Sequence, residues 1–113
     1  MVKITKKQNL LLIDIIGFHK IWALKHQLRV TKQDVISAYQ NESELEKSKG
    51  FRFGTYIPNF ITAGTFRKLD GTTNFWDVMN KKNTIIIELR NNFYHKLYLE
   101  VENPIETITL LTS

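Results

Sequence analysis

Three histidines, His19, His26 and His95, are the side chains best suited to metal binding or proton transfer. A zinc site needs three or four ligands held together, and His19 and His26 would face opposite sides of a continuous strand. The chain has no cysteine, which excludes disulfides and thiolate metal sites. We therefore expect no bound metal and no cofactor, and we interpret His95 as a hydrogen-bonded residue at a strand end.

The motifs of common enzymes do not occur in the sequence. No serine lies in a nucleophile elbow, no glycine loop leads into Lys-Ser or Lys-Thr, and no two carboxylates are paired as a glycosidase requires. Asp14 is the unusual acid, because it interrupts the apolar stretch 10–16. It either faces solvent, or pairs with a base on an adjacent strand, or is a buried catalytic carboxylate. We predict that the chain is not an enzyme.

The net charge of +5 has two interpretations. Scattered basic residues are typical of a solvated surface, whereas a focused basic face binds phosphates or an anionic membrane. The basic residues are scattered along the sequence rather than clustered, which favours the solvated surface. The best candidate for an anionic-ligand face, lying near the first strands, consists of Lys20, Lys25, Arg29 and Lys32.

A second basic and aromatic group lies near the C-terminus. Tyr94, Lys96 and Tyr98 alternate along one predicted strand, a pattern that can bind single-stranded nucleic acid by charge and stacking. Glu100 and Glu102 fall on the same face and oppose that interpretation. A solvated face is therefore favoured.

Period-two alternation predicts two hairpins between residues 65 and 102. One turns at Asp70-Gly71, a pair typical of type I′ turns, and the other at Asn91-Asn92. We expect a four-stranded antiparallel meander. The residues expected to point inward are Ile85, Ile87, Leu89, Leu97, Leu99 and Val101, and those expected to point outward are Glu88, Arg90, Lys96 and Glu100.

The N-terminal half is less regular. Residues 1–8 are expected to form a flexible arm, and the apolar stretch 10–16 a buried strand rather than a signal peptide, because Asp14 interrupts it. Residues 18–30 fit either a strand or a helix, with the strand favoured. Residues 35–39 read as a further strand, and the polar stretch 41–50 as a surface loop or a helical turn. No apolar run is long enough to span a membrane.

The C-terminus contains a helix-starting sequence. Asn103 can cap the helix, Pro104 fits its first position, and Glu106 its third. The segment is too short to be stable alone. We therefore expect Ile105, Ile108 and Leu111 to be buried against the core and to plug one end of a barrel.

Several short motifs follow one another in the order of a known family. They are Gly17, Lys20, Ala23-Leu24, Arg52, Gly54-Thr55, Ile57-Pro58, Ala63-Gly64-Thr65-Phe66, Phe75-Trp76 and Glu102-Asn103-Pro104. Together they resemble small bacterial proteins with a pleckstrin-homology-like fold and no established function, although Asn59 replaces the glycine expected after Pro58. The resemblance covers most of residues 10–111 and implies no catalytic residues.

The predicted fold is therefore mainly β: a small antiparallel pleckstrin-homology-like barrel of six or seven strands, capped by one C-terminal helix. Residues 1–113 form a single domain of ordinary size. We expect a non-enzymatic binding or scaffold domain that binds a protein partner or associates with itself. The alternative is an anionic ligand, either a lipid headgroup or nucleic acid. The lack of cysteine favours the cytoplasm.

Overall fold

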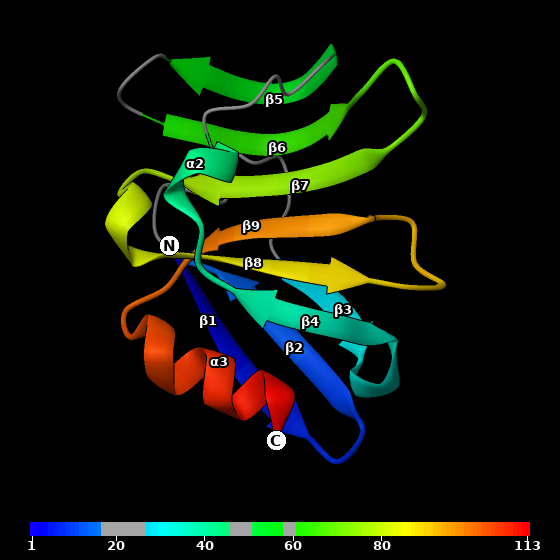
Figure 1. Ribbon diagram of the computed structural model, residues 1–113, viewed down its shortest axis with the longest axis vertical. Coiled ribbons are helices and arrows are strands. Elements are labelled where there is room, and N and C mark those ends of the chain that lie inside the picture. Colours follow the sequence, from blue (N-terminus) through cyan, green and yellow to red (C-terminus); the bar gives the residue numbers. More distant parts are fainter. Residues whose placement is uncertain (17–26, 46–50, 58–60) are drawn as a thin grey trace.

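The computed structural model describes residues 1–16, 27–45, 51–57 and 61–113. Its strands form two sheets (Figure 1). The three-stranded sheet has the order β1-β2-β3, and the six-stranded sheet the order β4-β8-β9-β7-β6-β5. The strands are β1 (Val2–Lys7), β2 (Leu10–Ile15), β3 (Gln27–Thr31), β4 (Val35–Tyr39), β5 (Phe51–Ile57), β6 (Ile61–Arg67), β7 (Thr73–Val78), β8 (Thr84–Leu89) and β9 (Lys96–Glu100).

Two α-helices and two 3₁₀ turns complete the described chain. The α-helices are α2 (Glu42–Leu45) and α3 (Pro104–Thr112), and the 3₁₀ turns are η1 (Lys32–Asp34) and η2 (Lys81–Asn83). The protein is thus mainly β with a C-terminal helix, as the sequence predicts. No closed barrel is found among the described strands, which form two sheets instead.

The main core lies between the two sheets. Alternate residues of β2 and β3, such as Leu11, Ile13 and Val30, pack with residues from β7, β8 and β9 of the larger sheet. The inward orientation predicted for six residues is confirmed, because all of them belong to this core: Ile85, Ile87, Leu89, Leu97, Leu99 and Val101.

The opposite face of the six-stranded sheet is also covered. Trp76, Ile86 and Tyr98 lie there in a second buried cluster, to which Leu45 of α2 contributes. The predicted exposure of Glu100 is therefore wrong. This carboxylate is buried, and its Oε1 accepts hydrogen bonds from the backbone N–H groups of Met79 (2.9 Å) and Asn80 (3.3 Å).

The predicted meander is wrong in the position of β9. This strand lies between β7 and β8, antiparallel to β8 and parallel to β7. The side chains of β9 explain this central position, because Leu97 and Leu99 are buried on one face of the sheet and Tyr98 on the other. A strand that is apolar on both faces gains most from a central position.

The N-terminal residues form a strand, where the sequence predicted a flexible arm. Strand β1 pairs antiparallel with β2 over its whole length, and Val2 is buried. The predicted strands at 10–16 and 35–39 are confirmed as β2 and β4. Of the ambiguous stretch 18–30, residues 27–30 lie in β3, while 18–26 lie outside the described residues.

Both predicted hairpin turns are present. Asn91 has a φ of 52°, the left-handed conformation expected there. In the other turn only Gly71 is left-handed, at 91°, so it is not the predicted type I′. The Gly71 N–H donates to the carbonyl of Lys68 instead (3.0 Å), which centres the turn on Leu69 and Asp70.

Helix α3 begins as predicted. The Asn103 side chain accepts a hydrogen bond from the backbone N–H of Glu106 (3.2 Å), and Pro104 occupies the first turn. The helix packs against β4 and β8. Leu111 is buried and Ile108 lies against the main core, but Ile105 is 76% exposed. Residues on one face of a helix recur every three or four positions, and two full turns before Leu111 the inward position is Pro104. Ile105 is the next residue and is rotated away from the core.

We expect Leu99→Ala to lower the free energy of unfolding by about 2–5 kcal/mol, because it leaves a cavity in the main core. Leu69→Ala is the matched control, since Leu69 is 89% exposed and its loss should cost less than about 0.5 kcal/mol. Urea denaturation measures both. An equal loss of unfolding free energy in the Leu99→Ala and Leu69→Ala variants would contradict the packing of β9 between the two clusters.

Helix α3 permits a second matched comparison. Leu111→Ala should cost about 2–5 kcal/mol in the same assay, because Leu111 is buried beneath the helix. Ile105→Ala should cost less than about 0.5 kcal/mol, because Ile105 faces solvent. A larger loss at Ile105 than at Leu111 would mean that the helix is rotated about its axis.

Candidate functional site

The four basic residues expected to bind an anion are only partly described. Lys20 and Lys25 lie outside the described residues. Arg29 is exposed on the outer face of the three-stranded sheet, where its Nε donates to Gln27 Oε1 (3.3 Å). Lys32 is partly buried in η1. Of the two described residues, Arg29 therefore lies on the sheet face and Lys32 in the turn that follows β3.

Asp14 and His95 have structural contacts. Asp14 Oδ1 accepts a hydrogen bond from the Gln27 side-chain amide on β3 (2.7 Å), at the exposed surface. His95 Nδ1 accepts from the backbone N–H of Thr73 (3.1 Å), which confirms the predicted role of His95 at a strand end. Among the described residues no three metal-ligating side chains gather.

The predicted outer face of Tyr94, Lys96 and Tyr98 is not a stacking surface. Tyr94 is buried in the main core, and its hydroxyl lies 2.8 Å from that of Thr65. Tyr98 is buried on the opposite face, with its ring stacked on Trp76 at 3.9 Å between centroids. Neither ring is available to a base.

Glu44 of α2 joins these residues into a cluster that the sequence did not predict. Its carboxylate accepts hydrogen bonds from Tyr39 Oη (2.9 Å) and Tyr98 Oη (3.1 Å), and forms an ion pair with Lys96 Nζ (2.7 Å). The next residue, Leu45, is buried in the second cluster. Helix α2 is therefore held against the sheet by the charged side chain of Glu44 and the apolar side chain of Leu45.

Burial and hydrogen bonding within the cluster shift the pKa values of its groups. Burial raises the pKa of Glu44, but hydrogen bonds from Lys96, Tyr39 and Tyr98 outweigh it and lower the pKa below its ordinary value of 4.5. Burial, with the neighbouring Glu44 carboxylate, raises the pKa of Tyr98. Burial alone would lower the pKa of Lys96, but hydrogen bonding to Glu44 outweighs it and raises that pKa. An ionised carboxylate with three donors suits a structural fastening better than a catalytic base.

We expect Glu44→Gln to destabilise the protein by about 1–3 kcal/mol at neutral pH, because it removes a charged hydrogen-bond acceptor. The folded pKa of Glu44 is lower than its unfolded value of 4.5. Its contribution is therefore complete above that value and is lost as the pH falls through the folded pKa. The difference from the wild type should shrink with acidification.

Urea denaturation between about pH 7 and about pH 3 measures this difference. Glu42→Gln is the matched control, since Glu42 is an exposed acid of the same helix. A Glu44→Gln difference that is independent of pH, or equal to that of the control, would contradict the fastening.

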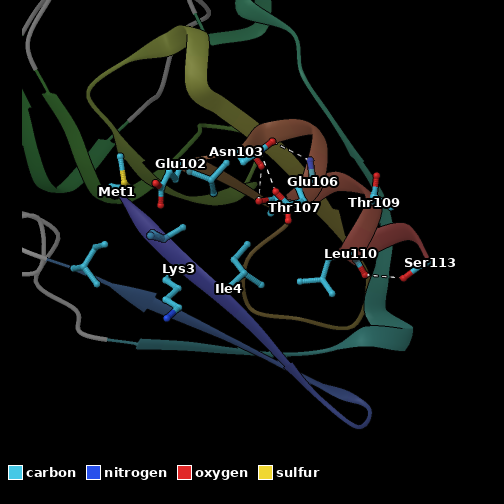
Figure 2. A pocket seen from close by; sticks show the side chains of 13 residues that line it. Met1, Lys3, Ile4, Glu102, Asn103, Glu106, Thr107, Thr109, Leu110 and Ser113 are labelled. Atoms are coloured by element: carbon cyan, nitrogen blue, oxygen red, sulfur yellow. Dashed lines mark hydrogen bonds between the residues drawn. The ribbon is translucent and has the colours of Figure 1, made fainter.

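A groove lies between β1 and α3. It has a volume of about 640 Å³, within the range of ligand sites. Figure 2 shows Ile4 of β1 and Leu110 of α3 pointing toward one another across it. Sequence reasoning missed this groove because it treated one of its walls, residues 1–8, as an arm.

One wall of the groove is a sheet edge. Among the described strands, β1 pairs only with β2. Their two-residue turn makes Lys7↔Leu10 a hydrogen-bonded pair, and such pairs recur at every second residue of an antiparallel ladder. The bond from Ile16 N–H to the Met1 carbonyl (3.2 Å) continues the series. The N–H and C=O groups of Val2, Ile4 and Lys6 therefore point toward the open edge.

The groove is charged at one end and apolar further along. Glu102 and Glu106 are exposed where α3 begins, and Glu102 lies beside Met1 (Figure 2). Lys3 of β1 also lines the groove. Glu106 also accepts a hydrogen bond from the Asn103 side-chain amide (2.9 Å). The facing residues Ile4 and Leu110 form the apolar part.

The Met1 side of the groove is anchored by a buried acid. The Met1 ammonium group forms an ion pair with Asp77 Oδ2 (2.8 Å), and Asp77 is fully buried in β7. This contact ties the start of β1 to the larger sheet. The edge of β1 is thus held at a defined position beside α3.

Comparison with protein-family models, curated proteins and solved structures finds no match to this chain. Within the described residues, no helix is both long and apolar enough to cross a membrane. Function is therefore inferred from the geometry of the groove and of the surface.

Proposed function

We propose that this chain is a non-enzymatic binding domain for an extended peptide segment of a protein partner. The segment adds to the edge of β1 and lies in the groove against α3. The observation that supports this is the open strand edge along the wall of a groove of about 640 Å³. Strand addition supplies affinity through main-chain hydrogen bonds and specificity through pockets for alternate side chains.

The lining of the groove defines the class of peptide. An apolar side chain fits between Ile4 and Leu110, and a lysine or arginine is attracted to Glu102 and Glu106. Val2 and Ile4 are two residues apart, so positions two apart on the added strand face the same side. The partner we propose therefore carries a basic residue two positions from an apolar one.

We also propose, as finer features, a pleckstrin-homology-like relationship and a cytoplasmic location. The mainly β chain with its C-terminal helix supports the first, although the parallel β7–β9 pair departs from the antiparallel barrel that the resemblance implies. The lack of cysteine supports the second.

Selection from a random peptide library displayed on phage tests the function. We expect wild-type protein to enrich peptides with the apolar and basic pair. Leu110→Lys should weaken the selected peptide at least about tenfold, because it removes the apolar contact and repels the basic side chain. Ile105→Lys is the matched control on the exposed face of the same helix and should leave binding unchanged.

Amide chemical shifts then locate the peptide. Those of Val2, Ile4 and Lys6 should change most on binding, because these residues face the edge. No enrichment, or equal binding by the Leu110→Lys variant, would refute the proposal. Concentration-dependent dimers lost in Leu110→Lys would instead identify a second copy of the chain as the occupant.

A further inference from the structure

Four turns lie along one side of the molecule, from the upper right to the lower right of Figure 1, and this side is here named the turn end: residues 67–72, 90–95, 31–34 and 6–9. Backbone hydrogen bonds connect them. Lys32 N–H donates to the Asn9 carbonyl (2.9 Å), and Arg90 N–H to the Asp34 carbonyl (2.8 Å). His95 N–H donates to the carbonyl of Thr73, which follows the turn at 67–72 (2.7 Å).

Two of these turns expose large apolar side chains. Leu69 is 89% exposed and Phe93 is 67% exposed. The turns that carry these two residues lie on the same side of the molecule, so one flat partner surface can contact both. Both are described residues of hairpins in the six-stranded sheet.

Local contacts order the turns that carry both apolar residues. The Phe93 ring packs edge-on against Tyr94 at 5.1 Å between centroids, and Tyr94 is buried against Phe75. The turn with Leu69 is closed by bonds from Lys68 N–H to the Thr72 carbonyl (2.8 Å) and from Thr72 N–H to Asp70 Oδ1 (2.9 Å). Rigid turns lose little conformational entropy when they bind.

The turn end is also basic. Its described residues include two carboxylates, Asp34 and Asp70, and six cations, which are Lys6, Lys7, Lys32, Arg67, Lys68 and Arg90. Exposed apolar side chains on a side of the molecule that is also rich in cations complement a membrane whose acyl boundary lies beneath anionic phosphates. An aliphatic side chain such as Leu69 gains nothing from stacking on a nucleobase, which argues against nucleic acid.

We propose that the turn end docks on an anionic membrane surface, with Leu69 and Phe93 entering the headgroup region and the surrounding cations contacting lipid phosphates. This surface shares no residue with the lining of the groove between β1 and α3. Lys6 alone belongs both to the turn end and to the edge of β1 proposed to bind a peptide. The variants at Leu69 and Phe93 leave that edge intact, so the two inferences can be tested separately.

Cosedimentation with vesicles tests the proposal. The full chain should bind phosphatidylcholine vesicles containing about 30% phosphatidylserine, and binding should weaken with salt, because screening reduces attraction to the anionic surface. The double variant Leu69→Ser/Phe93→Ser should bind at least about tenfold more weakly. Ile105→Ser, an exposed apolar residue on α3, is the matched control and should bind as the wild type does.

Phe93→Trp reports insertion directly. The fluorescence added by this substitution should be quenched by lipids with brominated acyl chains. Unaltered binding by the double variant, absence of quenching, or equal binding to pure phosphatidylcholine would overturn the proposal. Tighter binding to a single-stranded oligothymidine than to the anionic vesicles, lost in the same double variant, would also overturn it and would identify a nucleic-acid surface.

Discussion

Strands β7, β9 and β8 are buried on both faces, and the rest of the structure depends on covering them. The three-stranded sheet covers one face, with Leu97 and Leu99 in the main core. Helix α2 contributes to the cover on the other, where Leu45 packs in the cluster of Trp76 and Tyr98. Glu44 can approach this apolar surface as an ion because Lys96 and two tyrosines meet its carboxylate.

Local sequence patterns predicted the strands and the helix better than they predicted which strands lie side by side. The alternation at 84–90 and 94–102 predicted the β8–β9 hairpin, and Asn103-Pro104 predicted the start of α3. The position of β9 beside β7 depends on pairing between two segments that are remote in sequence. A turn motif predicts only the pairing of the two strands that it connects. Glu100 illustrates the consequence, since a carboxylate on an apparently outward position is buried by the chain at Met79 and Asn80.

The candidate site was hidden for the same reason. Val2 and Ile4 alternate with Lys3 and Thr5, a pattern typical of a strand, although the prediction for residues 1–8 was a flexible arm. The groove exists because that strand lies at a sheet edge beside α3, and a sequence does not state which strand is at an edge. Glu44 lies in a polar stretch whose contact with the sheet depends on Tyr39, Lys96 and Tyr98 together.

The open edge of β1 is the claim on which the functional account rests, and amide hydrogen exchange measures it directly. Lys3 and Thr5 fall in the series of β1 that bonds to β2, whereas Ile4 and Lys6 face the groove side. We expect slow exchange at Lys3 and Thr5 and fast exchange at Ile4 and Lys6 in the free protein. Equal protection at all four amides would show that the edge is already covered and would contradict this expectation.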